Sequence, residues 1–430
     1  MTVSGATLMA LATWTPALFV FAVGACVGSL VNVLVYRLPR GLPVVLPSSR
    51  CPMCEKKLTW RENIPILGWL LLRGRCRFCR GPISAEYPLV EAFVALLFVG
   101  FYIVWYIPDL SGLDLGLRTI QPEWARNGPR ETWPAFAALL VLIGCLVAMT
   151  IVDFKTYTIP LVLTWVPVGV ALVLHPVNAL LLGEHGLRFH ASDLGGWIIA
   201  TPGEGVFWWA GAALGTAIGL ALSWLLVSRG LIGRSFADYE QWEAEALAEA
   251  EANEARPGES ETPEMWIQYP HARREMVREL AYLAAPIALG WLGGAVAIRL
   301  SAPEQSAPLW LVALSSVAMG YIIGASVVWG VRIFGTVLFG KEAMGLGDVH
   351  LLAAIGAVLG WVDAVLTFFA AVLVGLVAAG LSAIRNSSSA RVLAFGPCLA
   401  IGAILVLLAK PAIEAALTGL FSLPETMDLP

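Results

Sequence analysis

The amino-acid sequence predicts an all-α polytopic membrane protein with about 8–10 transmembrane helices and one small cytoplasmic loop that contains paired cysteines. Of its 430 residues, 58% are hydrophobic and only 13% are charged, whereas an ordinary soluble domain has about 25% charged residues. The mean hydropathy is +0.76. The charged residues are concentrated in a few loops, so topology follows from their placement and not from the net charge of −4.

Apolar stretches long enough to cross a bilayer, about 20 residues of helix each, recur along the chain. They lie near residues 15–36, 84–107, 134–152, 158–182, 206–228, 279–299 and 309–339. A shorter run at 349–361 and two further stretches near 363–384 and 394–416 follow. The first stretch has no Lys or Arg before it and a basic segment directly after it, which favours an uncleaved span over a signal peptide.

The polar loops divide the chain into five predicted regions. They are a first transmembrane span at 1–36, a cysteine-bearing loop at 37–83, helices at 84–228, an acidic hydrophilic insertion at 229–278 and further helices at 279–430. Alanine and glutamate predominate in the insertion, which favours a solvated helical linker. An acidic surface that receives a basic partner segment is the functional alternative.

Basic residues determine the predicted orientation of the chain. Between Arg37 and Arg80 there are ten Arg or Lys residues and two acids, Glu55 and Glu62, and short basic loops stay in the cytoplasm. Counting spans from this loop places the odd-numbered connections on the cytoplasmic side. Aspartates at 153 and 348 follow the third and the seventh predicted span, so both come to the same side of the membrane.

Asp153 and Asp348 are therefore the candidate catalytic residues. An ionised residue near the bilayer core costs about 3 kcal/mol or more, so it usually lines a wet cavity or has a function. Two adjacent carboxyl groups can share one proton, so that one activates water while the other donates to a peptide carbonyl. Gly345 and Gly347 are the candidate substrate-binding residues, because the missing Cβ leaves room for a substrate strand. Each aspartate alone could instead cap a helix.

The cysteine-bearing loop contains the candidate metal ligands, Cys51, Cys54, Cys76 and Cys79. Two Cys-x-x-Cys pairs separated by 21 residues are close to zinc-ribbon spacing, and four thiolates can hold one zinc ion in a tetrahedron. Two disulfides or idle thiols are the alternative, which a reducing cytoplasm disfavours. The sequence thus predicts a cytoplasmic zinc-ribbon-like loop with structural zinc.

Six motifs follow one another along the chain. They read GACVGSLVNVLVYRLPRGLP, the double Cys-x-x-Cys, NIPILGWLLLRGRC, ISAEYPLVEA, GLGDVHLLAAIGAVLGW and FGPCLAIG. In this order they resemble the type IV prepilin peptidases, also called leader peptidase/N-methyltransferases, which are GxGD membrane aspartyl proteases. The resemblance covers residues 20–107, 145–175, 340–384 and 394–410.

The resemblance implies an enzyme that removes the basic leader of prepilins or pseudopilins after a glycine, at the cytoplasmic face of the bacterial inner membrane. Its catalytic aspartates correspond to Asp153 and Asp348, the pair reached above from charge placement. It also implies N-methylation of the new N-terminus with S-adenosylmethionine, a capacity linked to the cysteine-bearing loop. The expected partners are type IV pilus or type II secretion substrates and the lipid bilayer, without nucleic acid.

The chain departs from the family pattern at two places. Family members commonly have lysine where this chain has His350, and often a Pro-Asp pair where it has Pro160 and Leu161. A neutral imidazole near the two aspartates would depress a carboxylate pKa less than an ammonium group would, so activity is expected to peak at a different pH. The second departure is interpreted as loss of a turn or cap residue and not of a catalytic group.

Three other classes of protein remain as alternatives. A transporter also needs carboxylates in the membrane, but the sequence shows no convincing internal repeat. A presenilin-like protease that cuts inside helices shares the GxGD element, and the four paired cysteines argue for the pilin-processing branch. A non-catalytic membrane assembly protein with a zinc site would tolerate loss of either aspartate.

Overall fold

The structure is a computed structural model that describes residues 5–46, 48–107, 125, 128–184, 205–239, 241–242, 244–246, 248, 269–301, 307–384 and 394–420. Within these residues the chain is helical, and its β-structure consists of two isolated bridges in the cysteine-bearing loop. Eight helices in this part of the chain are long and apolar enough to cross a membrane, and a bent helix pair near the C-terminus would make nine. The predicted all-α polytopic membrane fold is therefore confirmed.

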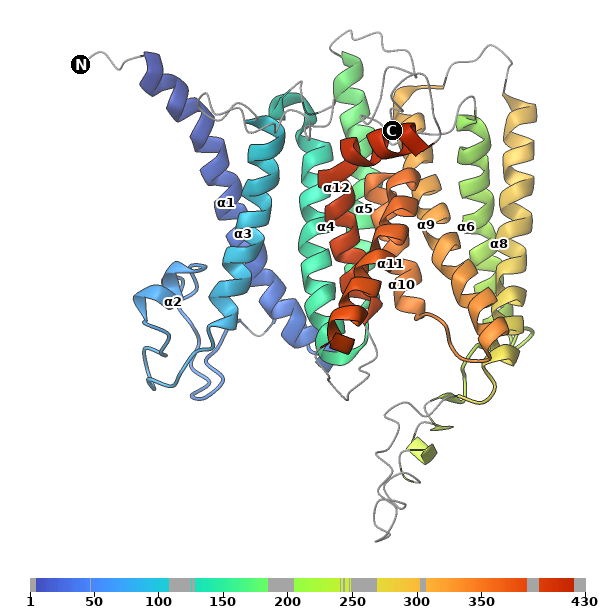
Figure 1. Cartoon of the computed structure of the whole chain (residues 1–430), viewed down its shortest axis with the longest axis horizontal. Helices are drawn as coiled ribbons and strands as arrows, with labels where there is room; N and C mark the ends of the chain where they lie inside the picture. Colours follow the sequence, from blue (N-terminus) through green and yellow to red (C-terminus); the bar gives the residue numbers. More distant parts are fainter. Residues whose placement is uncertain are drawn as a thin grey trace.

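The long helices stand side by side in one bundle (Figure 1). They are α1 (Gly5–Arg37), α3 (Glu86–Tyr106), α4 (Pro129–Thr156), α5 (Leu161–Glu184), α6 (Val206–Ser228), α8 (Ala272–Leu300), α9 (Leu309–Phe339), α11 (Trp361–Ile384) and α12 (Phe395–Leu420). The short elements are η1 (Leu38–Arg40), α2 (Leu67–Leu71) and α10 (Leu346–Leu359). Helices α6 and α9 have the predicted limits. Helices α4 and α8 begin earlier than predicted, because their first turns contain charged residues that an apolar window excludes.

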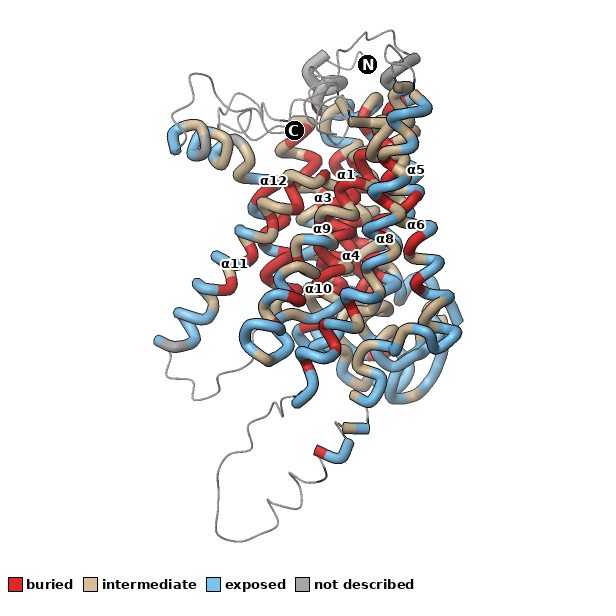
Figure 2. Tube along the Cα trace, turned by 90° about the vertical axis from the view of Figure 1, so that its right-hand side faces the viewer, coloured by how far each residue is buried: buried red, intermediate tan, exposed pale blue. Residues whose placement is uncertain are grey.

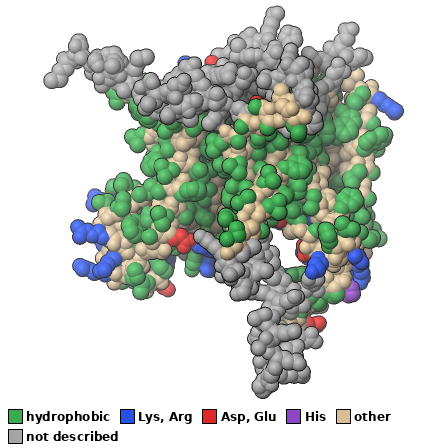
Figure 3. Space-filling model, in the orientation of Figure 1, with side chains coloured by type: hydrophobic (Ala, Val, Ile, Leu, Met, Phe, Trp, Pro, Cys, Tyr) green, Lys and Arg blue, Asp and Glu red, His purple; other side chains and the backbone are tan. Residues whose placement is uncertain are grey.

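The outside of the bundle is apolar, as a lipid environment requires. Figure 3 shows hydrophobic side chains over the middle of the bundle, and most Lys and Arg side chains on this face toward its lower end. Figure 2 shows buried residues along the interior helices. The largest cluster of buried residues joins α4, α5, α9, α10 and α12.

Helix α10 is the most enclosed element of this core, with ten of its 14 residues buried. At about 1.5 Å per residue it is about 21 Å long, shorter than the hydrocarbon core of about 30 Å. It packs directly against α9, where a methyl group added at Gly324 would lie 2.5 Å from the carbonyl oxygen of Leu352. Gly320 and Gly356 face each other in the same way. Small residues let two helix backbones approach closely, so this contact fixes the depth of α10.

The lower end of the bundle in Figure 1 contains the loop between α1 and α3 and the short connections from α4 to α5 and from α9 to α10. The end of α6 and the start of α8, which flank the insertion, lie there too. The cysteine-bearing loop, the end of α4, the ends of the insertion and the start of α10 therefore share one end of the molecule. This is the arrangement that counting the odd-numbered connections predicts.

We expect Gly320→Val to lower the free energy of unfolding by on the order of 2 kcal/mol, because its side chain would overlap the backbone of Gly356. Thermal unfolding in detergent measures this effect. Gly330→Val is the matched control on the same helix, since a methyl group added there meets open space among the described residues. Equal unfolding midpoints for the two variants would contradict the close packing of α9 on α10.

Candidate active site and metal centre

The four predicted metal ligands come together in the loop between α1 and α3. The Sγ atoms of Cys51 and Cys79 are 3.8 Å apart, those of Cys54 and Cys76 are 4.0 Å apart, and all four lie within 4.8 Å of one another. With Zn–S bonds of about 2.3 Å, a tetrahedral zinc site has sulfur–sulfur edges of about 3.8 Å. All four are free thiols. The residues therefore fit one tetrahedral metal ion and do not form the disulfides of the alternative reading.

The same short turn holds each Cys-x-x-Cys pair. The backbone N–H of Glu55 donates to the carbonyl of Cys51, and that of Arg80 donates to the carbonyl of Cys76, both at 2.9 Å. Glu55 and Arg80 also share a left-handed backbone, with φ of 56° and 57°. One antiparallel bridge closes each turn. The repeated turn explains how two distant pairs present their sulfurs to a common centre.

The electrostatics of this cluster favour a bound cation. Hydrogen bonds from the backbone N–H groups of Cys79 and Phe78 lower the pKa of the Cys76 thiol to about 7. A backbone hydrogen bond from Lys56 lowers the pKa of Cys54, but burial and the three other sulfurs together raise it to about 11. Four thiolates at these distances repel one another, and a coordinated metal ion removes that repulsion.

Side chains of α1 and α3 attach the cysteine-bearing loop to the bundle. The buried carboxylate of Glu91 accepts a hydrogen bond of 2.7 Å from the backbone N–H of Ile66. Asn32 of α1 donates to the carbonyl of Tyr87 at 3.0 Å. At Gly28, an added methyl group would lie 2.6 Å from the Cα atom of Glu91, so α1 and α3 pack closely beneath the loop.

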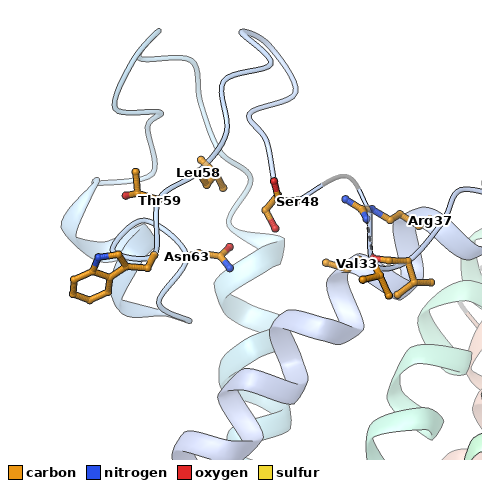
Figure 4. Close-up of a pocket in the computed structure, with 10 residues that line it drawn as sticks. Val33, Arg37, Ser48, Leu58, Thr59 and Asn63 are labelled. Carbon is orange, nitrogen blue, oxygen red and sulfur yellow. Dashed lines mark hydrogen bonds between the residues drawn. The ribbon is translucent and has the colours of Figure 1, made fainter.

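A small hollow lies between the end of α1 and the cysteine-bearing loop (Figure 4). Its volume is about 240 Å³. It is lined by Val33, Arg37, Val44, Val45, Ser48, Ser49, Leu58, Thr59, Trp60 and Asn63. The guanidinium group of Arg37 donates to the carbonyls of Pro43 and Val44 at its edge. Sites that enclose a drug-sized ligand have about 300–1,000 Å³, so this hollow could hold only part of S-adenosylmethionine.

Asp153 and Asp348, the two predicted catalytic residues, are brought together at the lower end of the bundle. Asp153 lies in the last turn of α4 and Asp348 in the first turn of α10, and both are buried. The two carboxyl groups interact electrostatically. The backbone N–H of Gly396 donates to Asp153, and that of Gly345 donates to Asp348.

Gly396 and Gly345 border the aspartates, and Gly347 and Ile159 lie next to them. A methyl group added at Gly396 would lie 2.6 Å from Oδ2 of Asp153 and 3.3 Å from Cδ1 of Ile159. One added at Gly347 would lie 2.9 Å from Cβ of the same isoleucine. At Gly345, it would lie 3.4 Å from Oδ2 of Asp348. Gly347 therefore packs against Ile159, a contact that the sequence did not predict, whereas Gly345 borders the aspartates directly.

The two departures from the family pattern lie near this site. The ring of His350 lies 6.2 Å from the ring of Trp165 on α5, measured between centroids. Leu161 is the first residue of α5. The interpretation of the missing aspartate as a turn or cap residue stays a prediction.

Three further residues near the aspartates were not predicted as site residues from the sequence. Gly396 and Cys398 come from the start of α12, and the thiol of Cys398 interacts electrostatically with both carboxyl groups. Arg332 of α9 interacts in the same way with Asp348. Arg332 carried a signal, because it is the only charged residue in the apolar stretch 309–339 and intramembrane charges usually mark functional sites.

Comparisons with known protein families match two parts of this chain. The Bacterial Peptidase A24 N-terminal domain matches residues 22–105, and the type IV leader peptidase family matches residues 283–380. No solved structure matches the chain.

Three relatives carry the name prepilin leader peptidase/N-methyltransferase. The protein from Myxococcus xanthus is 55% identical over 19% of this chain and 24% of its own length. The protein from Klebsiella pneumoniae is 43% identical over 23% of this chain and 46% of its own length. The protein from Aeromonas hydrophila is 34% identical over 36% of this chain and 54% of its own length. The matched part thus spans about half or less of each relative. The two family models match residues 22–105 and 283–380, which together make up less than half of this chain.

Proposed function

We propose that this chain is a membrane aspartyl endopeptidase that cleaves the basic leader of type IV prepilins or pseudopilins after a glycine. Asp153 and Asp348 act as its catalytic pair. The observation that carries the proposal is the meeting of two buried aspartates, from helices far apart in the sequence, at one end of a membrane bundle. The names of the relatives support the same reaction.

The chemistry follows from two carboxyl groups that share one proton. The ionised group accepts a proton from water, and the water oxygen attacks the carbonyl carbon of the scissile peptide bond. The protonated group donates its proton to the carbonyl oxygen. When the intermediate collapses, the C–N bond breaks, the leaving nitrogen takes the proton that the first group had accepted from water, and the second group recovers its own proton. The hydrogen bonds from Gly396 and Gly345 hold the two carboxylates in place.

We further propose that this end of the bundle faces the cytoplasm of a bacterial inner membrane. The ten basic residues between Arg37 and Arg80 support this orientation. A basic leader then reaches the aspartates from the cytoplasm, while the pilin helix stays in the lipid. Gly345 and Gly347 remain the candidates for contact with the substrate backbone, and Gly345 is favoured because it borders Asp348.

We also propose that the cysteine cluster holds one structural zinc ion, and that the chain methylates the new N-terminal amine with S-adenosylmethionine. Four thiolates complete the tetrahedron, so the zinc keeps no open position for a substrate. S-adenosylmethionine, when bound, would supply a methyl group to the amine nitrogen, with S-adenosylhomocysteine and one proton released. The relatives' names support the methyl transfer. No residue is assigned to the methyl donor, because the hollow beside the loop is too small to enclose it.

Replacing either Asp153 or Asp348 with Asn is expected to lower cleavage of a leader-bearing pilin by at least about 10³-fold, since each carboxyl group is needed for proton transfer. Product masses measure cleavage, and thermal unfolding in detergent verifies the fold. Glu131→Gln, at the opposite end of α4, is the matched control and should retain full activity. A variant of either aspartate that turns over near the wild-type rate would favour the non-catalytic assembly protein.

The role of Gly347 can be separated into packing and substrate contact. We expect Gly347→Ala to impair cleavage about tenfold, because the added methyl group would press on Ile159. If packing is the cause, adding Ile159→Ala should restore most of the rate. Failure of this rescue, with unchanged unfolding temperatures, would instead assign the space beside Gly347 to the substrate strand. Initial rates of the single and double variants provide the measurement.

Purified chain is expected to contain close to one zinc ion per molecule, which elemental analysis measures. Cys51→Ser or Cys76→Ser should lower this content and impair methylation more than cleavage, because the loop lies apart from the aspartates. Cys145→Ser is the control, since this buried cysteine of α4 lies outside the cluster. Absence of zinc, with the four thiols paired as disulfides, would overturn both the metal site and the cytoplasmic orientation.

A further inference from the structure

Arg332 has an unusual position for a charged side chain. It lies two turns before the end of α9, and only 2% of its side chain is exposed. A buried guanidinium group is costly unless charged and polar partners surround it. The partners of Arg332 therefore indicate what this charge does.

One side of the guanidinium group binds a carboxylate of α8. Nη2 of Arg332 lies 2.9 Å from Oε1 of Glu279, and Nε lies 3.1 and 3.2 Å from its two oxygens. Trp329 also donates to Oε2 of Glu279, at 2.8 Å. This bidentate pair is buried on both sides. Helices α8 and α9 are thus joined by a bidentate hydrogen-bonded ion pair between Arg332 and Glu279, whose geometry is fixed by the planar guanidinium group.

The other side of the guanidinium group binds the segment that leads into α10. Nη1 donates to the carboxylate of Glu342 and to the carbonyl of Met344. One turn further along α9, Thr336 accepts a hydrogen bond of 3.1 Å from the N–H of Ala343. Met344 immediately precedes Gly345, whose N–H binds Asp348. Residues 341–345 are therefore held at two points on α9 directly before the aspartate.

One described end of the acidic insertion contacts the same arginine, and the other end packs against the first. The ring of Phe236 lies 5.3 Å from Cζ of Arg332. The backbone N–H of Phe236 donates to the carboxylate of Glu275 at 2.8 Å. Tyr269, at the far end of the insertion, packs 5.4 Å from Phe236 and donates to Asp238 at 2.6 Å. Residues before and after the acidic stretch thus form one aromatic cluster, comprising Phe236, Tyr239, Trp242 and Tyr269.

We propose that Arg332 is a positioning residue for Asp348. Its pair with Glu279 fixes the guanidinium group, and the free edge of that group holds Glu342 and Met344 so that the turn into α10 keeps one conformation. The aromatic cluster of the insertion covers the arginine from the lower end of the bundle. A conformational change in the insertion would then alter the position of Asp348. The proposal rests on the proposed function only for its kinetic consequence.

Hydrogen exchange on the full chain in detergent tests the positioning without requiring activity. In Arg332→Gln, the amides of residues 341–347 should exchange at least about tenfold faster, while those in the middle of α10 stay protected. Arg332→Lys keeps the charge but loses the fork, and it should give a smaller change in the same direction. Phe236→Ala tests the cover from the insertion without leaving a buried charge unpaired, and it should also loosen the turn.

Arg299→Gln, at the other end of α8, controls for the loss of one arginine and should leave exchange unchanged. If Arg332→Gln does not fold, hydrogen exchange in Arg332→Lys and Phe236→Ala tests the proposal instead. Unchanged exchange of 341–347 in all folded variants would overturn the proposal.

Kinetics separate positioning from a merely structural role. With a leader-bearing pilin, Arg332→Lys should lower kcat about tenfold and leave KM nearly unchanged, because the aspartate is displaced while the substrate still binds. A structural role alone would reduce the amount of folded enzyme and leave the kcat of the folded fraction intact. If the wild-type chain does not cleave the pilin, the proposed function fails while the exchange result still decides the role of Arg332.

Discussion

The close packing of α10 on α9 is the contact on which the rest of the site depends. Gly320 and Gly356 allow the two backbones to touch, so a helix too short to cross the bilayer is held at a fixed depth inside the protein. Its first turn then lies beside the end of α4 instead of in lipid. The carboxylate of Asp348 at that turn is tolerated in the bundle because this end of the bundle lies near the membrane surface and a neighbouring backbone N–H donates to the carboxylate.

Electrostatics restrict the same region further. Asp153 and Asp348 interact electrostatically, which disfavours ionisation of both carboxyl groups at once. The buried guanidinium group of Arg332 also acts on Asp348, but it binds other partners directly. Arg332 is bound to Glu279 on one side and to Glu342 and Met344 on the other. It therefore acts on Asp348 mainly through the backbone of the turn and over a distance.

The sequence predicted the features that depend on local composition. Spans such as 206–228 and 309–339 coincide with α6 and α9 because hydropathy is a property of consecutive residues. The cysteine cluster followed from ligand spacing, and the shared end of the two aspartates followed from counting spans. Contacts between helices could not be predicted, because they depend on how each helix is rotated. Gly396 against Asp153 is of this kind. Ile159 against Gly347 depends instead on the path of the connection between α4 and α5. Arg332 was open to prediction as a lone charge in an apolar stretch, although its partners were not.

The cysteine-bearing loop and the aspartates lie apart but are mechanically connected. The loop is tied to α3 through the bond between Ile66 and Glu91. At the start of the same helix, Glu86 forms an ion pair with Lys155, which lies two residues after Asp153 on α4. That pair is exposed, so it contributes little free energy by itself. It does place the first turn of α3 against the last turn of α4. A metal ion bound by the four cysteines would keep the loop folded and, through these contacts, would keep α3 against the helix that contains Asp153.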